Sequence, residues 1–588
     1  MKFLLVGINA KYIHSNPAIY SLRACAGKED RESVELAEYT INNRGEEILS
    51  DIFKRKPDVI GFSCYIWNFH MVRELIYDLV KVLPETDIWL GGPEVSFDCE
   101  KLLKEFPMIK GIMVGEGENT FRELLSCYVH ASSGSQSPVD VVLQAKLEKI
   151  PGLYLPSGHT GERELTDLDS LPFYYDSLKN FENRIIYYES SRGCPFRCAY
   201  CLSSIDKRVR FCSPEKVKRE LQFFLDQKVE QVKFVDRTFN CNHEHAMEIW
   251  RFIKENDNNV TNFHFEIAAD ILTEEEIQIL SEMRPGLVQL EIGVQSVNEE
   301  TLKAINRSAD TASITEAVVR LQKGMNIHIH LDLIAGLPFE NYDSFVNSFN
   351  CVYAMKPQQL QLGFLKVLKG SPIAGRVTEY GIVFQAQSPY EVLYTNWISY
   401  EQILKLKQVE EMVELYYNSN QFRHTLTVLE QEFGDAFSMF SEFADYYEKK
   451  GYFVKTPARA DRYQVLLDFI MEVAKEKFEL YRELLTFDYY LRENAKSRPK
   501  FMTDMSLYYN RIRNFYQKEE TEPQYLKNYQ GYHARQVMKM THMEPFFYPV
   551  WEELPERMAI RQEQPVFILL DYEKRDVLTG NAMAFVLR

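Results

Sequence analysis

The sequence contains no apolar stretch that approaches the roughly 20 residues of a membrane-spanning helix. It begins MKFLLVGINAKYIH, and this short apolar run is interrupted by Asn9 and Lys11. No small-residue cleavage site follows, so we expect no signal peptide. These absences predict a cytoplasmic protein with no membrane partner.

Positive charge is also scarce. Lys and Arg number 68 against 85 Asp and Glu, which gives a net charge of −17. A protein whose main partner is a phosphate backbone usually carries the opposite sign, so we do not expect nucleic acid as a partner. The hydrophobic fraction of 45% and the charged fraction of 26% are typical of globular proteins, and 588 residues suffice for roughly three to five domains.

Cysteine is absent from the whole sequence after Cys351. The chain has 10 cysteines, and in a reducing compartment we expect free thiols rather than disulfides. Three of them, Cys194, Cys198 and Cys201, lie close together, whereas the others are widely spaced. The cysteine chemistry of the chain is therefore expected at these three residues.

Residues 1–135 alternate short apolar runs with helical stretches, which is typical of a doubly wound, Rossmann-like parallel sheet. Such a sheet binds its ligand at the carboxyl ends of its strands. Two of the runs, 88–92 and 109–115, end in the glycine-rich turns GGPE and GEGE. The sequence therefore predicts a ligand site at these turns, followed by a linker over residues 136–180.

Residues 181–400 repeat the strand–helix alternation. The predicted strands are 185–191, 231–239, 263–269, 287–296, 326–336 and 359–368. The predicted helices start near Pro214, His243, Thr273, Asn298, Asp310 and Asn341. This pattern predicts a partial (β/α)6 TIM-like barrel with its site at the carboxyl ends of the strands. The pattern of residues 401–588 predicts a mainly helical domain of unknown role, with two strands near its end at 566–572 and 582–587.

The cysteine motif, CxxxCxxC, follows the first predicted barrel strand. Three thiolates at this spacing can hold one iron–sulfur cluster, and a 4Fe-4S cube with three cysteine ligands leaves one iron open to a small molecule. Zinc is the alternative, but it needs a fourth ligand, which His243 or His245 would have to supply. We expect Cys194, Cys198 and Cys201 to hold an iron–sulfur cluster.

On this motif, residues 180–400 resemble the radical S-adenosylmethionine (SAM) superfamily, most closely the branch of oxygen-independent coproporphyrinogen oxidase. The resemblance implies a 4Fe-4S cluster whose open iron chelates SAM and cleaves it reductively to a 5′-deoxyadenosyl radical. The positions that match the SAM-binding residues of that branch are Tyr188, Glu266, Gln295, Arg307 and Asp332. The glycine-rich segment expected after the second strand is DRTFN here. Asp236 is therefore predicted either to hold the SAM ammonium group or to pair with Arg237.

A doubly wound domain with two glycine turns, a linker and CxxxCxxC in one chain resembles the cobalamin-binding radical SAM enzymes. The resemblance implies that the turns approach the corrinoid, because glycine has no side chain to block it. The candidate cobalamin residues are Ser63, Gly91, Gly92, Pro93, Gly115 and Glu116. The DxHxxG motif that supplies a histidine ligand to cobalt in mutases is absent, and His14 lacks its context. The C-terminal extension and the signature KYIHSN resemble an uncharacterised subgroup of these proteins.

These resemblances imply an enzyme that transfers a methyl group from methylcobalamin to a carbon radical on a small-molecule or peptide substrate. An electron donor such as flavodoxin or ferredoxin would reduce the cluster. A radical oxidation, cyclisation or rearrangement without methyl transfer is the first alternative, and product mass separates the two. A non-catalytic cobalamin or redox sensor is the second, although a sensor has no use for a SAM site. A transfer-RNA methylthiotransferase would need three further cysteines suited to a second cluster, and Cys25, Cys64 and Cys99 are widely spaced.

Overall fold

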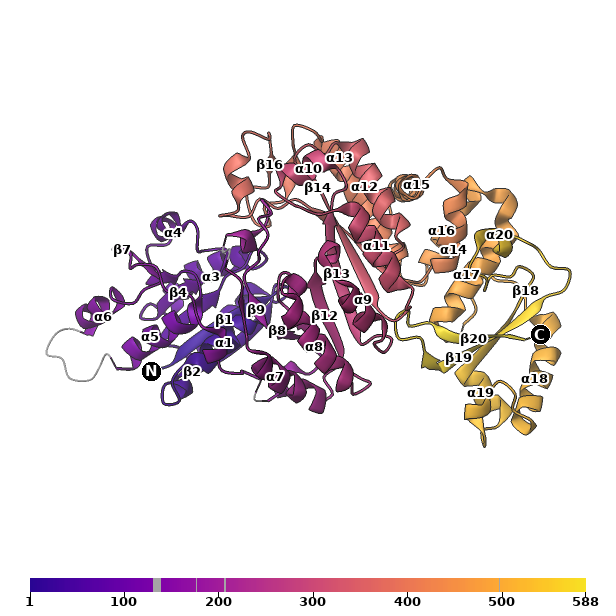
Figure 1. Cartoon of the computed structure of the whole chain (residues 1–588), viewed down its shortest axis with the longest axis horizontal. Helices are drawn as coiled ribbons and strands as arrows, with labels where there is room; N and C mark the ends of the chain where they lie inside the picture. Colours follow the sequence, from indigo (N-terminus) through magenta and orange to yellow (C-terminus); the bar gives the residue numbers. More distant parts are fainter. Residues whose placement is uncertain (131–138, 176, 206–207, 496, 588) are drawn as a thin grey trace.

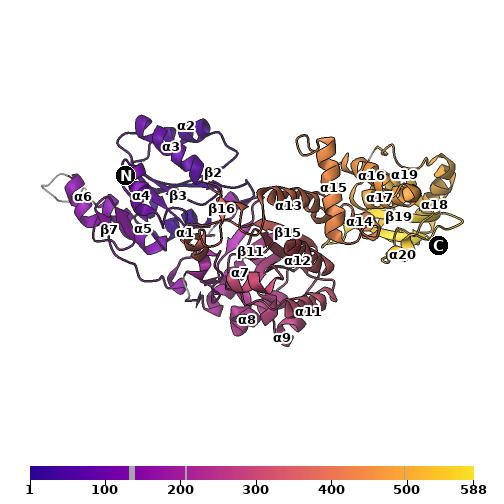
Figure 2. The same cartoon turned by 90° about the horizontal axis from the view of Figure 1, so that it is seen from above.

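The computed structural model describes residues 1–130, 139–175, 177–205, 208–495 and 497–587. Three regions follow one another along the molecule, with the central sheet between the N-terminal sheet and the C-terminal region (Figures 1 and 2). None of the helices in the described part of the chain combines the length and the apolar character needed to cross a bilayer.

The N-terminal sheet has seven strands in the order β2-β1-β3-β4-β5-β6-β7. Its first five are parallel: β1 (Phe3–Asn9), β2 (Val34–Thr40), β3 (Val59–Ser63), β4 (Asp87–Gly91) and β5 (Gly111–Met113). The helices are α1 (Pro17–Cys25), α2 (Gly45–Arg55), α3 (Phe69–Val82), α4 (Cys99–Glu105), α5 (Gly117–Val129) and α6 (Val139–Leu147). All of β1 is buried, with Phe3 in one core and Leu4 in the other, because helices cover both faces. The predicted doubly wound sheet is confirmed.

The segment 136–180, which we expected to be a linker, contributes to this sheet. Strand β6 (Leu153–Leu155) pairs antiparallel with β5, and β7 (Gly158–His159) pairs antiparallel with β6. These strands are three and two residues long, too short to produce a visible alternation in the sequence. Residues 131–138, which include the start of this predicted linker, lie outside the described residues.

The central sheet has six parallel strands in the order β15-β14-β13-β12-β11-β8 and forms the predicted partial barrel. The strands are β8 (Ile186–Tyr188), β11 (Gln231–Phe234), β12 (Asn262–Ile267), β13 (Val288–Gln295), β14 (His328–Ala335) and β15 (Gln359–Phe364). The helices are α7 (Pro214–Asp226), α8 (His243–Glu255), α9 (Glu274–Ser281), α10 (Glu299–Ala304), α11 (Thr311–Gln322) and α12 (Tyr342–Ala354). Four predicted helix starts are N-caps whose side chains accept from the first turn: Thr273, Asn298, Asp310 and Asn341.

Two side chains satisfy the backbone at the open edges of this sheet. On β8, the Tyr175 hydroxyl donates to the carbonyl oxygen of Tyr187 at 2.6 Å and accepts from its N–H at 3.1 Å. On β15, the Asn418 amide accepts from the N–H of Leu360 and donates to its carbonyl oxygen, both at 2.9 Å. Each side chain takes the place of a neighbouring strand, so these edge residues offer no free pairing groups to another chain.

The C-terminal region is mainly helical, as predicted. Its helices are α13 (Tyr400–Met412), the π-helix η8 (Val413–Asn418), α14 (Arg423–Leu429), α15 (Ala436–Lys450), α16 (Arg462–Val473), α17 (Phe478–Arg492), α18 (Tyr509–Thr521), α19 (Ala534–Met540) and α20 (Pro555–Met558). An antiparallel sheet contains β18 (Thr541–Phe546), β19 (Val566–Arg575) and β20 (Ala582–Leu587). The last two match the predicted late strands. Strand β18 was missed because Glu544 and Pro545 break its apolar pattern.

Candidate active site

A cavity of about 210 Å³ lies at the carboxyl ends of the barrel strands. The three motif cysteines, Cys194, Cys198 and Cys201, all line it. No further cysteine or histidine of the described residues lines this cavity, and His243 and His245, the candidate zinc ligands, lie outside it. Three thiols without a fourth such ligand fit a 4Fe-4S cube with one open iron better than a closed zinc site.

The cysteine loop needs a glycine at its start and is held by a backbone hydrogen bond near its end. The chain enters it from β9 (Ser191–Arg192) through Gly193, whose φ is +104°. A Cβ atom on Gly193 would lie 2.5 Å from the carbonyl oxygen of Arg208, so glycine is required. Within the loop, the N–H of Ala199 donates to the carbonyl oxygen of Ile305 at 2.8 Å. This bond ties the cysteines to the end of α10.

Four of the predicted SAM residues line the same cavity. They are Glu266 on β12, Gln295 at the end of β13, Arg307 after α10 and Asp332 on β14. The buried atoms Oε1 of Gln295 and Nε of Arg307 have no hydrogen-bond partner in the part of the chain that the structure describes. Because a buried polar atom without a partner destabilises the protein, these atoms fit a polar ligand such as SAM.

The end of β13 is strained where it presents Gln295. Gln295 has a φ of +73° and follows a β-bulge, a conformation that residues with a side chain rarely adopt. A Cβ atom on Gly293 would lie 2.2 Å from Nε2 of Gln295, so this glycine leaves space for the amide. Arg307 donates to the carbonyl oxygen of Gly293 and, at 3.7 Å, to Sγ of Cys198. Strain of this kind tends to accompany function.

Burial changes the acidity of two carboxyl groups in this cavity. It raises the pKa of Glu266 to about 7, and the charge of Arg237 opposes this shift only in part. Burial also raises the pKa of Asp332, although His330 lies 3.1 Å away and opposes the shift. Glu266 therefore exchanges its proton near neutral pH.

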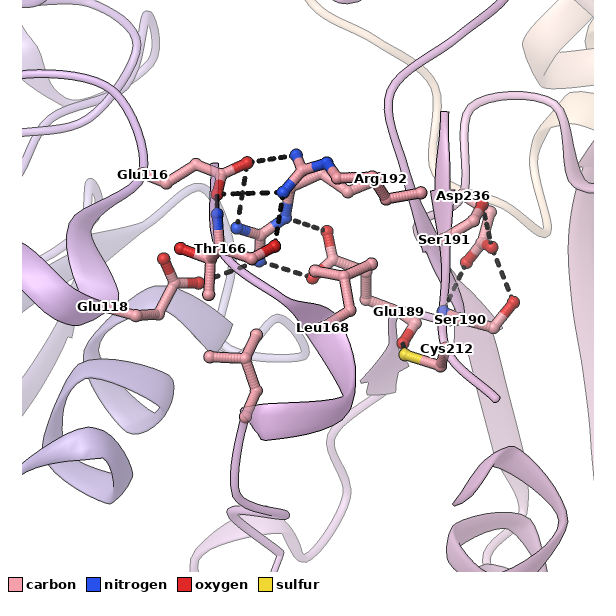
Figure 3. A network of polar contacts seen from close by, with 12 residues as sticks. Glu116, Glu118, Thr166, Leu168, Glu189, Ser190, Ser191, Arg192, Cys212 and Asp236 are labelled. Atoms are coloured by element: carbon pink, nitrogen blue, oxygen red, sulfur yellow. Dashed lines mark hydrogen bonds and ion pairs between the residues drawn. The ribbon is translucent and has the colours of Figure 1, made fainter. Parts of the chain in front are cut away.

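Two predicted SAM residues, Tyr188 and Asp236, do not line this cavity. Tyr188 lines a second, larger cavity instead, and its hydroxyl donates to Oε2 of Glu220 on α7 at 2.8 Å. The carboxylate of Asp236 accepts from the N–H and hydroxyl of Ser190 at 2.9 and 2.7 Å, and from the hydroxyl of Ser191 at 2.5 Å (Figure 3). Asp236 thus holds the chain that leads into the cysteine loop, and it pairs with serines rather than with Arg237.

A second cavity, of about 950 Å³, lies between the N-terminal sheet and the barrel. All the predicted cobalamin residues line it: Ser63, Gly91, Gly92, Pro93, Gly115 and Glu116. Gly115 has a φ of +78°, and no atom lies within 4 Å of a Cβ built on it. Gly92 has a φ of +110°, and its Cβ would lie 2.5 Å from the carbonyl oxygen of Cys64. Gly115 therefore brings bare backbone up to a large cavity, which fits a corrinoid, whereas Gly92 is required because the backbone of Cys64 lies against it.

Much of the wall of this larger cavity was missed by sequence reasoning. The segment 152–175 contributes Arg163, Leu168 and Tyr174, and the barrel contributes Tyr187 and Arg192. These residues come from two separate parts of the chain, and no spacing pattern connects them. Turn signals, Pro-Gly at 151–152 and Leu-Pro at 171–172, were the sequence features that marked this segment.

An ion network joins the two walls of the larger cavity (Figure 3). Arg192 on β9 donates to Glu189 at 2.9 and 2.7 Å and to Glu118 at 2.8 Å. Glu116 pairs with Arg210 and lies 3.5 Å from Nη1 of Arg192. Burial alone would raise the pKa of Glu116, but its hydrogen bonds and these cations lower it to about 2. Glu116 is therefore part of the contact between the two domains.

Comparison with known families matches three successive parts of the chain. Residues 4–125 match the B12 binding domain, residues 188–352 match the radical SAM superfamily, and residues 378–569 match a protein family of unknown function, DUF4080.

The chain is also similar to curated relatives, at low sequence identity. The uncharacterized methyltransferase PH0819 of Pyrococcus horikoshii is 24% identical, over 61% of this chain and 77% of its own length. The cobalamin-dependent radical SAM methyltransferase TokK of Streptomyces tokunonensis is 23% identical, over 67% of this chain and 62% of its own length. The solved structure of OxsB with aqua-cobalamin superposes with a TM-score of 0.56 at 14% identity, covering 83% of this chain and 79% of OxsB.

The chain thus combines a B12-binding domain, a radical SAM domain and a DUF4080 region, and it is a cobalamin-dependent radical SAM enzyme. Its cofactors are a 4Fe-4S cluster, SAM and cobalamin.

Proposed function

We propose that this enzyme methylates an unreactive carbon of its substrate. One observation carries the proposal: the cysteine cavity and the larger cavity share a lining residue, Arg237, so a molecule at their junction would reach both. The relatives named as methyltransferases, at 24% and 23% identity, support this reaction class.

When bound, the cofactors supply a 5′-deoxyadenosyl radical from SAM and a methyl group from methylcobalamin. The protein holds them in place. The three motif cysteines would ligate the cluster, while Gln295 and Arg307 would offer an amide and a guanidinium group to the polar groups of SAM. The carboxyl groups of Glu266 and Asp332 would accept from its ammonium or hydroxyl groups. On the opposite side, the glycine turns would receive the corrinoid.

The reaction needs electrons from outside the chain. A C–H hydrogen of the substrate would leave with 5′-deoxyadenosine, and the methyl group would be replaced from a further SAM, which becomes S-adenosylhomocysteine. A low-potential carrier of the flavodoxin or ferredoxin class would supply two electrons per turnover, one for the reductive cleavage of the first SAM and one to return cobalamin to the form that accepts a methyl group from the second. The proposal therefore predicts 5′-deoxyadenosine and S-adenosylhomocysteine in equal amounts during turnover.

The test is an anaerobic assay of the protein reconstituted with iron, sulfide and cobalamin. SAM with a deuterated methyl group and a low-potential reductant are added to fractionated small-molecule extracts, and products are separated by mass. A product heavier by one deuterated methyl group, formed only with reductant, supports methyl transfer. Cleavage of SAM in every fraction without any labelled product contradicts it.

A radical reaction without methyl transfer is the second candidate. It is favoured by the similarity to the anaerobic magnesium-protoporphyrin IX monomethyl ester cyclase of Cereibacter sphaeroides, which is 22% identical over 53% of this chain and 52% of its own length. In that case the same assay would give 5′-deoxyadenosine and a product whose mass lacks the deuterated methyl group.

A further inference from the structure

Arg237 lines both cavities. It follows β11, and its side chain is 57% exposed. Its nearest carboxylate oxygen is Oε2 of Glu266, 4.0 Å from Nη1. Within the described residues the guanidinium group donates no hydrogen bond. A guanidinium group has several N–H donors in a planar fork, so this position is suited to an anion that the protein itself does not supply.

Other arginines around these cavities are already engaged. Arg192 donates to Glu189 with two nitrogens, and Arg163 donates to Glu123 with two nitrogens at 3.0 and 2.7 Å. Arg307 donates to a backbone carbonyl oxygen and to a motif cysteine. These three hold protein groups together, so they contribute to the shape of the cavities rather than to an open anion site.

We infer that Arg237 binds an anionic group of the substrate, most simply a carboxylate, and so selects an anionic small molecule. This inference rests on the proposed function, because a methylated substrate must approach SAM from one side and the corrinoid from the other. A residue that faces both cavities is where the substrate would lie. A charge-assisted bidentate contact there would fix the reacting carbon relative to both cofactors.

The position of Arg237 also indicates that its ligand is the substrate rather than a cofactor. The carboxylate of SAM has a closer candidate in Arg307, which lies beside Cys198 in the cysteine cavity. The glycine turns at Gly92 and Gly115 belong to the opposite, N-terminal wall of the larger cavity. The junction itself presents one guanidinium group that none of these contacts uses.

The test uses propionate and its uncharged analogue propionamide as probes, followed by ligand-observed NMR. The full-length protein is reconstituted with cluster and cobalamin, and SAM is present without reductant so that the cysteine cavity is filled. Wild type, Arg237→Gln and Arg237→Lys are compared with Arg376→Gln, an exposed arginine paired with Glu379 that lines neither cavity.

We expect propionate but not propionamide to bind the wild type and the Arg376→Gln variant. Arg237→Gln should weaken propionate binding about tenfold, and Arg237→Lys should restore part of it. Equal binding of propionate to Arg237→Gln and wild type, or no binding to wild type, would overturn the inference. Parallel measurements of SAM affinity and retained cobalamin must stay unchanged in Arg237→Gln, because a loss of either would assign the arginine to that cofactor. Failure of the labelling assay with intact propionate binding would instead refute methyl transfer.

Discussion

The two cavities of this enzyme are built in different ways. The cysteine cavity is lined by the cysteine loop, by the strand ends of a single sheet and by the segment after α10 that carries Arg307, all within residues 194–332. The larger cavity is lined by residues between 5 and 237 that come from the N-terminal sheet, the segment 152–175 and the barrel. A site at the strand ends of one sheet follows from the order of its strands, whereas a site between domains depends on how the domains dock.

The pKa values of two glutamates, one in each cavity, also differ. Glu266 in the cysteine cavity is partly buried, its nearest cation, Arg237, lies 4.0 Å away, and its pKa is raised to about 7. Glu116 at the larger cavity is also partly buried, but Arg210 and Arg192 lower its pKa to about 2. The smaller cavity therefore keeps a carboxyl group available for a ligand, while the larger one uses its carboxylate to hold two domains together.

The largest effect is expected from Cys198→Ala, which removes one of three ligands from the cysteine cavity. The variant should lose its cluster and all formation of 5′-deoxyadenosine, and it should still retain cobalamin because the larger cavity is untouched. Iron and sulfide content, the visible spectrum and the cobalamin content check this.

The matched control is Cys241→Ala, a partly buried cysteine that does not line this cavity. It should keep the cluster. Loss of iron from Cys241→Ala would mean that a fourth cysteine ligates the cluster, and the open iron required for SAM would then be missing.

Arg192→Gln should have the next largest effect, because it leaves Glu118 and Glu189 without their cation between the domains. Breaking such a pair from one side typically destabilises a protein by about 3 kcal/mol. The apparent free energy of unfolding in urea should fall by this amount, and cobalamin should be released more readily. Arg376→Gln at an exposed pair should change neither. A stable Arg192→Gln protein that retains cobalamin would show that the network is not needed for docking.

The pH dependence of stability should separate the two glutamates. Glu266 keeps its proton in the folded protein between pH 4.5 and about 7, so its contribution to stability falls as the pH rises through this window. Glu116 contributes stability above pH 4.5 that is lost as the pH falls toward about 2. Glu266→Gln should reduce the loss of stability between pH 4.5 and about 7. Glu116→Gln should reduce the loss of stability between pH 4.5 and about 2. Each reduction should be about 1–3 kcal/mol. Urea unfolding across this pH range measures both, and slopes unchanged by the substitutions would contradict these assignments.

The smallest effect on stability is expected from Gly115→Ala, because φ is +78° and the space beyond is open. A left-handed conformation costs a residue with a side chain about 1–2 kcal/mol. Gly451→Ala is the matched control: its φ is +72°, no atom lies within 4 Å, and it ends α15 far from both cavities in sequence. The two variants should lose similar stability in thermal unfolding, but only Gly115→Ala should bind cobalamin more weakly. Equal cobalamin affinities would remove the GEGE turn from the corrinoid site.

Local patterns in the sequence determined much of this protein. The spacing of Cys194, Cys198 and Cys201 predicted a shared cavity, because three side chains on one short loop cannot lie far apart. The N-cap residues, such as Thr273 and Asn341, marked helix starts through hydrogen bonds within a single turn. The barrel strands were visible because apolar residues recur at alternating positions, as in β13 (Val288–Gln295), where the buried residues Val288, Leu290, Ile292 and Val294 alternate with partly buried ones.

Tertiary structure alone decided the rest. Tyr188 lies on the predicted strand, but which neighbour its hydroxyl meets depends on the packing of α7, so it bonds Glu220 outside the cysteine cavity. Asn418 forms a hydrogen bond with Leu360 on β15, 58 residues away in the sequence. Arg192 forms one with Glu118, 74 residues away. Such contacts carry no local signal, because they exist only once separate regions of the chain have docked. The sequence by itself determined which cofactors this enzyme uses, and tertiary structure decided which residues wall the space between them.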